Sequence, residues 1–210
     1  MRTCKNALTM FGNKADLDAL KQATGLADNN FSFENIAASP DELIEATKND
    51  ILSPRIVEKF GAMNINSWRI KNWGCTSDSF NVTIIDESRL NANNIKTEAE
   101  QKEKEIPERF REKFRSIAQG IDAAMSVSFE TDEYPSGAIH ELSVKHPNIL
   151  IHFGYDSESE DESGWVALKG GEQLGHQHYD SCLRTIRIHV EPHTEATGAL
   201  IQSLSDEESN

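Results

Sequence analysis

The sequence has little of what a disulfide framework or a thiolate metal site requires. It contains three cysteines in 210 residues, Cys4, Cys75 and Cys182, and no two of them form a Cys-x-x-Cys pair. An odd and scattered set of thiols argues against a disulfide scaffold and against a zinc site built from thiolates. The sequence therefore indicates a protein that works in a reducing compartment.

Long apolar runs are also absent. No stretch approaches the roughly 18 apolar residues that a membrane-spanning helix needs, and the first residues have no apolar run of signal-peptide length. We therefore expect a soluble, cytoplasmic protein with no membrane partner.

The motifs of nucleophilic and phosphate chemistry are missing as well. There is no Gly-x-Ser-x-Gly, no glycine-rich phosphate loop and no Cys/His pair identifiable by spacing. Cys75 follows Trp73-Gly74, a distinctive context, but free cysteine is most often a small buried residue. We interpret Cys75 as a buried residue at the start of a strand, and Trp68 and Trp73 as core anchors. The sequence predicts no enzyme, no catalytic residue and no cofactor.

Histidines near the C-terminus raise the question of a metal. His176 and His178 are two residues apart, and alternate residues of a strand point the same way, so such a pair can chelate. His189 and His193 have the spacing of a helical pair, but Pro192 excludes a regular helix there. We assign no metal site, and whether these four histidines bind a metal stays open.

Charge is the strongest feature of the composition. The sequence has 35 Asp and Glu against 21 Lys and Arg, a formal net charge of −14. Such a surface repels phosphate backbones and attracts basic partners. RNA binding through sheet aromatics is not favoured either, because Phe80, Phe129 and Phe153 fall in the buried register. We expect no direct nucleic-acid binding and a host protein with a basic surface as the partner.

Hydrophobic patterning predicts the fold class. Alternation predicts strands over residues 5–11, 80–86, 125–131, 149–155, 165–168 and 182–190, and an extended segment over 31–36. Capping and spacing predict helices after Asn13, after Pro40, and over 54–60, 106–121 and 136–146. Each strand has one polar face, which argues against a doubly wound parallel sheet. The result is α+β: a ferredoxin-like, mixed or antiparallel sheet with helices packed on one face.

The same patterning predicts the domain organisation. Residues 1–175 form one ferredoxin-like domain, in which residues 88–122 are a helical insertion. Residues 176–210 form a C-terminal strand and an acidic tail.

Several short motifs occur in order along the chain and together resemble a known family. They are Cys4-x-Asn6-x-Leu8-x-x-x-Gly12, Phe31-Ser-Phe-Glu-Asn-Ile36 with Pro40-Asp-Glu-Leu43, Trp68…Asn72-Trp73-Gly74, and the strand–Pro–helix–strand unit from Met125 to Tyr155. This set resembles the YubB ferredoxin-like domain family over roughly residues 4–170. The resemblance implies an accessory protein of a phage or plasmid that works inside a bacterial host cell, and it implies no catalytic residues.

An acidic run stands between the fourth and fifth predicted strands. It lacks the glycine and the final glutamate of a calcium loop, so we interpret it as a hairpin connection. Its charge suits a basic groove on a partner. The predicted partner-binding residues are Asp156, Glu158, Glu160, Asp161 and Glu162.

These features combine into one functional hypothesis. The protein is an acidic accessory protein that binds and inhibits a host factor, such as a defence nuclease or CRISPR effector whose nucleic-acid groove is basic. The alternatives are a self-associating module, which forms a homodimer through a sheet edge or the 106–121 helix, and a metal- or ligand-dependent enzyme.

Overall fold

The fold is built on a six-stranded antiparallel sheet in the order β2-β3-β1-β4-β5-β6. A computed structural model describes residues 3–51, 53–85, 112, 116, 120–157 and 162–180. The strands are β1 (Cys4–Gly12), β2 (Phe80–Ile85), β3 (Ala123–Thr131), β4 (Leu150–Ser157), β5 (Glu162–Lys169) and β6 (Glu172–Asp180). The predicted α+β class is confirmed.

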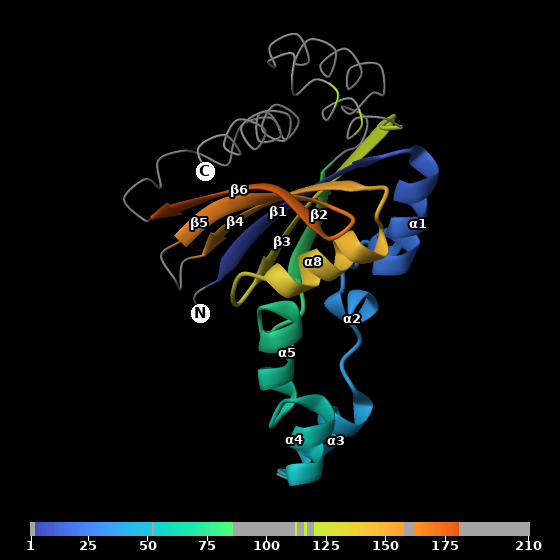
Figure 1. The fold of residues 1–210 in the computed structure, drawn as a ribbon. Coiled ribbons are helices and arrows are strands. Elements are labelled where there is room, and N and C mark those ends of the chain that lie inside the picture. The colour runs from blue at the N-terminus through green and yellow to red at the C-terminus, as the bar shows by residue number, and fades with distance from the viewer. Residues whose placement is uncertain are drawn as a thin grey trace.

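Helices connect β1 to β2 and β3 to β4. Between β1 and β2 come α1 (Lys14–Thr24), α2 (Phe33–Ile36), α3 (Asp41–Lys48), α4 (Pro54–Phe60) and α5 (Ile65–Trp73). Helix α8 (Ser136–Lys145) connects β3 to β4, and α1, α2 and α8 lie on one face of the sheet (Figure 1). The order β2-β3-β1-β4 with these crossovers is the split βαβ arrangement of ferredoxin-like folds. Strands β5 and β6 extend it as a meander.

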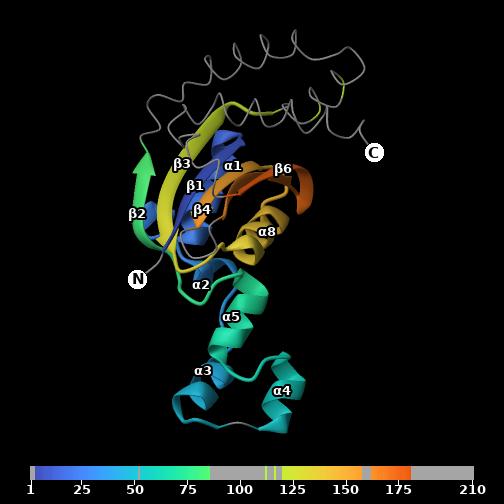
Figure 2. The same ribbon diagram turned by 90° about the vertical axis from the view of Figure 1, so that its left-hand side faces the viewer.

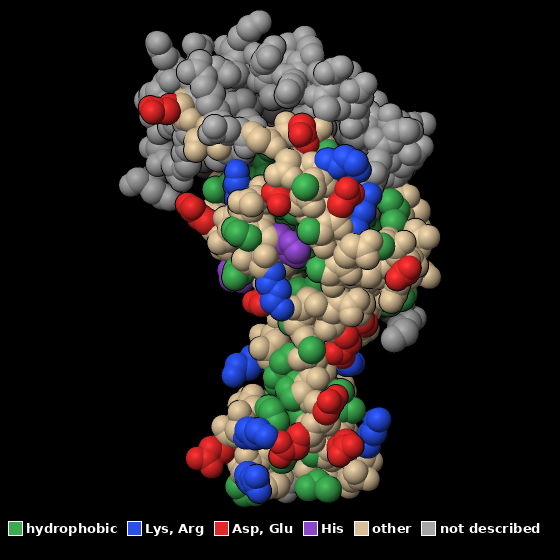
Figure 3. Space-filling model, turned by 90° about the vertical axis from the view of Figure 1, so that its right-hand side faces the viewer, with side chains coloured by type: hydrophobic (Ala, Val, Ile, Leu, Met, Phe, Trp, Pro, Cys, Tyr) green, Lys and Arg blue, Asp and Glu red, His purple; other side chains and the backbone are tan. Residues whose placement is uncertain are grey.

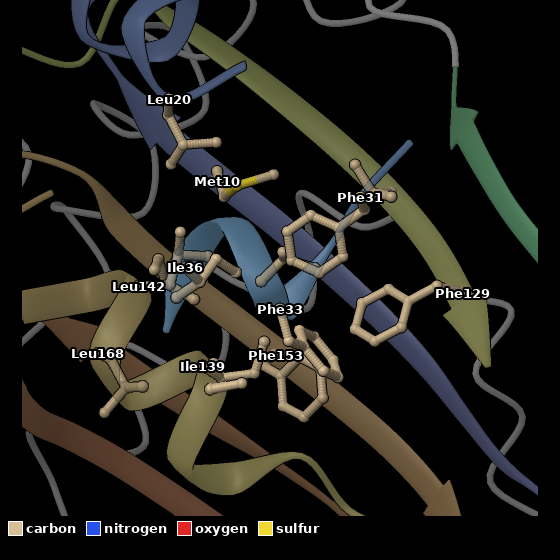
Figure 4. Packing of buried hydrophobic residues seen from close by; sticks show 14 of the residues in the cluster. Met10, Leu20, Phe31, Phe33, Ile36, Phe129, Ile139, Leu142, Phe153 and Leu168 are labelled. Carbon is tan, nitrogen blue, oxygen red and sulfur yellow. The ribbon is translucent and has the colours of Figure 1, made fainter. Parts of the chain in front are cut away.

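The core lies between the sheet and these helices. Residues of one parity on each strand point toward the helices, as the alternation predicted. Phe31 and Phe33 bracket Phe129, with ring centroids 5.0 and 5.9 Å away, and Phe129 stacks on Phe153 (Figure 4). All four rings are buried. These contacts join α2 to β3 and β4.

Helix boundaries follow local capping. The Asn13 side chain accepts a hydrogen bond from the Asp16 N–H at 2.9 Å and starts α1, and Gly25, at φ 86°, ends it. Asn64 and Ser67 form a capping box at the start of α5. Both are short-range signals that the sequence carries.

One predicted segment is wrong. Residues 31–36 were expected to be extended, but Phe33–Ile36 is the helix α2. The Asp78 carboxylate accepts hydrogen bonds from the Phe33 N–H and the Ser32 hydroxyl, each at 2.6 Å. A helix start stabilised from a residue 45 positions away leaves no mark in the local pattern.

The C-terminal part of the sheet also differs from the prediction. Strand β6 runs through residues 172–180, so the boundary placed at residue 175 falls inside a strand. The predicted last strand over 182–190 lies outside the described residues. So does most of the 106–121 helix, of which Glu112 and Ser116 are helical and exposed.

Helices α3, α4 and α5 form an arm that projects from the sheet (Figure 2). We use "the arm" for residues 41–73. Its small core consists of Leu43, Ala46, Ile56 and Ala62. Trp68 packs against both this core and the main core.

Candidate functional site

The register brings the ends of five strands to one end of the sheet. Cys4, at the start of β1, pairs with Thr131 at the end of β3 and with Ser157 at the end of β4. Ser157 pairs with Glu162 at the start of β5, and Glu162 pairs with Asp180 at the end of β6. The connection that the acidic run was predicted to form lies here, between two strands that form a hairpin as expected.

Acidic residues from separate parts of the chain gather at this end. We call this set the acidic end: Glu130, Glu133, Asp156, Glu162 and Asp180. One lysine, Lys5, lies in register between Glu130 and Asp156. With five acidic residues against one lysine, this end has a formal negative charge of the same sign as the net charge of the chain.

Two of the five predicted partner-binding residues, Asp156 and Glu162, are described, and both belong to the acidic end. Asp156 is the penultimate residue of β4 and Glu162 is the first residue of β5. Glu158, Glu160 and Asp161 lie outside the described residues. One carboxylate oxygen of Asp156, Oδ1, is buried and accepts no hydrogen bond in the described part of the chain. A hydrogen-bond donor supplied at this position would satisfy it.

Asp132, at the same end, has a structural task. Its carboxylate accepts hydrogen bonds from the backbone N–H groups of Thr76 and Ser77 at 3.1 and 3.0 Å, and from both hydroxyls. Burial alone would raise the pKa of Asp132, but these hydrogen bonds lower it below its ordinary value. Asp132 therefore stays ionised and ties the loop after α5 to the end of β3.

Cys75 lies in this loop and is buried, as predicted. It does not stand at the start of a strand, because β2 begins only at Phe80. Burial raises the pKa of its thiol, and the charges of Asp132 and Asp78 raise it further. The thiol donates to the Ser77 carbonyl oxygen at 3.3 Å. Because the thiolate is the nucleophile, a thiol held protonated in this way is unsuited to catalysis.

The histidine cluster is only partly described. His176 is exposed and its Nδ1 lies 2.9 Å from the Gln173 amide nitrogen, while His178 belongs to the same strand, β6. His189 and His193 lie outside the described residues. Within the part of the chain that the structure describes, no group of three or more His, Cys, Asp or Glu side chains is placed to hold a metal ion.

Sequence reasoning missed a buried histidine on the other face of the sheet. His152 in β4 stacks on Trp165 in β5, with ring centroids 5.7 Å apart. Its Nε2 is buried and has no hydrogen-bond partner among the described residues. Burial lowers the pKa of His152 to about 4. The sequence gives no signal for this, because His152 sits where a half-exposed strand residue is expected.

This buried histidine predicts acid sensitivity. The folded state keeps His152 neutral, whereas in the unfolded chain it titrates near its ordinary value of 6.5. Above the ordinary pKa of 6.5, the titration of His152 does not affect the unfolding free energy. As the pH falls from 6.5 toward the folded-state pKa, the unfolding free energy decreases, because the unfolded chain binds a proton that the folded state does not. We expect His152→Gln to remove about 2 kcal/mol of the loss in unfolding free energy between about pH 7 and about pH 5, measured by urea unfolding.

His140 on α8, which is exposed, provides the matched control. His140→Gln should leave the pH dependence of the wild type unchanged. An equal pH dependence in wild type and His152→Gln would show that His152 is not buried as a neutral ring.

Helices long and apolar enough to cross a membrane do not occur among the described residues.

Comparison with known proteins assigns no family. No family model matches the sequence, and no curated protein matches it. Among solved structures, the chain is similar to the crystal structure of a protein api92 from Yersinia pseudotuberculosis, which is assigned to family model DUF1281. The match has 11% identity and a TM-score of 0.41, and covers 85% of this chain and 98% of that one. At this level of likeness it assigns neither function nor ligand.

Proposed function

We propose that this protein is a non-enzymatic binding protein whose acidic end engages a basic surface on a protein partner. One observation carries the proposal: the strand register brings acidic residues of β3, β4, β5 and β6 to one end of the sheet. Asp156 and Glu162, the first and last residues of the acidic run, are at the same end.

The chemistry of the partner follows from this charge. Clustered carboxylates pair with Arg and Lys, and steering between opposite charges speeds association and weakens with salt. A surface rich in Arg and Lys is what a nucleic-acid groove presents. Occupying that groove would inhibit a host nuclease or CRISPR effector, because the protein would exclude the nucleic acid.

Two further features support a binding role. The Cys75 thiol is buried and held protonated, so it does not offer a nucleophile. The motifs shared with the YubB ferredoxin-like domain family favour an accessory protein of a phage or plasmid in a bacterial cell.

Neutralising the acidic run tests the proposal. The test variant replaces Asp156, Glu158, Glu160, Asp161 and Glu162 with Asn or Gln. We expect it to keep its melting temperature within a few degrees, since each amide has nearly the shape of the carboxylate that it replaces. We expect it to lose about tenfold or more in affinity for any partner that the wild type captures from bacterial lysate.

A control variant separates local charge from net charge. It replaces five exposed carboxylates that lie outside both the acidic end and residues 41–73 with their amides, namely Asp18, Asp28, Glu112, Asp122 and Glu172. Its net charge equals that of the test variant. Equal loss of capture in both variants would mean that net charge, and not the acidic end, determines binding, and full capture by the test variant would overturn the proposal.

A further inference from the structure

The arm is small for an independent helical unit. It spans residues 41–73, and among its described residues those buried in its own core are Leu43, Ala46, Ile56 and Ala62. Units below roughly 40 residues rarely bury enough apolar surface to be stable alone. At the end of the arm nearest the sheet, the Arg69 guanidinium forms an ion pair with the carboxylate of Glu34 in α2, with an N–O distance of 2.6 Å.

Exposed apolar side chains are concentrated on the arm. Among the described residues, five large hydrophobic side chains are exposed, and four of them belong to the arm. These four, with their exposed fractions, are Ile51 (53%), Val57 (37%), Met63 (59%) and Ile70 (49%). The fifth, Val144 (45%), is on α8. Figure 3 shows hydrophobic side chains at the neck and at the tip of the arm on one face. The arm is therefore the part of the described surface with the most large exposed apolar side chains, which favours it as an interaction site.

The charge of the arm differs from that of the whole chain. Its ionisable side chains are five acidic and five basic residues: Asp41, Glu42, Glu45, Asp50 and Glu58 with Lys48, Arg55, Lys59, Arg69 and Lys71. The arm therefore has no formal net charge, whereas the chain has −14. Two copies of the chain repel each other through their overall charge, but this repulsion is least where the arms meet.

We propose that the arm is the contact surface of a homodimer. In a two-fold dimer the same patch occurs on both sides, so it must be complementary to itself. The arm has equal numbers of acidic and basic side chains, so a second copy offers an opposite charge for each of its charges. This proposal uses a surface separate from the acidic end and does not depend on the proposed function.

Sedimentation of the full chain over a concentration series tests the homodimer. We expect the wild type to sediment as a dimer at micromolar concentrations and the double variant Met63→Ser, Ile70→Ser to raise the dimer dissociation constant by about tenfold or more. Val144→Ser is the matched control, because it removes an equally exposed apolar side chain outside the arm. It should leave the dissociation constant unchanged. The melting temperature of each dissociated variant checks that its fold is retained.

Salt gives the test a second readout. The dimer should tighten as salt screens the repulsion between two acidic chains, which is the opposite of what we expect for a basic partner at the acidic end. A wild type that is monomeric at all concentrations would overturn the proposal. A dimer that the arm variant leaves intact would overturn it too and would place the contact elsewhere, such as a sheet edge.

Discussion

Replacing Trp73 with alanine is expected to lower the unfolding free energy by about 3–5 kcal/mol. Trp73 is fully buried at the end of α5, and its ring meets the Phe33 ring edge-on at 5.8 Å. Its Nε1 donates a hydrogen bond to the Ala37 carbonyl oxygen at 2.8 Å, and the Arg69 guanidinium lies 4.6 Å from its ring. The substitution leaves a cavity and an unpaired carbonyl where the arm joins the core.

Trp68→Ala is the comparison that makes this test specific. Trp68 is half-buried and its ring lies 6.2 Å from that of Trp73, so its removal should cost clearly less. Urea unfolding of the two variants, with Trp73→Phe as a milder replacement, gives the three free energies. A cost below about 1 kcal/mol for Trp73→Ala would contradict its place in the core.

The second large effect is expected at Gly137, near the start of α8. A Cβ atom at this position would lie 2.8 Å from the Asn72 carbonyl carbon, closer still to its oxygen, and 3.2 Å from the Trp73 carbonyl carbon. Backbone atoms at the end of α5 cannot move away as a flexible side chain can. We expect Gly137→Ala to cost about 3 kcal/mol by forcing the two helices apart.

Gly154 in β4 provides the control for Gly137. A Cβ atom there would meet its nearest neighbours at 3.9 and 4.0 Å, an ordinary contact distance. Gly154→Ala should therefore be neutral or slightly stabilising, because glycine weakens a strand interior. Equal unfolding free energies for the two variants, measured by thermal or urea unfolding, would show that α5 and α8 do not approach closely at Gly137.

Local patterns were sufficient for most of the sheet and for α8. Strands β1, β3 and β4 alternate clearly because one face meets the helices, and α8 begins after Pro135 and ends at His146, as predicted. Strand β6 was missed because its polar and glycine residues show no apolar alternation. Helix α2 was missed because the residue that stabilises its start, Asp78, is distant in sequence.

The candidate site was predictable only in part. The acidic run stands out in the sequence because its residues are consecutive, and its place between two hairpin strands follows from the alternation on either side. Glu130, Glu133 and Asp180 could not be grouped with it, because only the strand register brings them to the same end of the sheet. The arm was not predicted as a unit for the same reason, since its small core joins α3, α4 and α5 only in three dimensions, and α5 itself was not predicted.

The most direct test of the central claim is capture from bacterial lysate with the wild type, the neutralised acidic-run variant and the control variant in parallel. Each is run at low and high salt, and the bound proteins are identified by mass spectrometry. The account predicts a nucleic-acid-binding protein that the wild type and the control variant capture at low salt, that high salt releases, and that the neutralised variant fails to capture. A partner that all three proteins hold equally at high salt would contradict it.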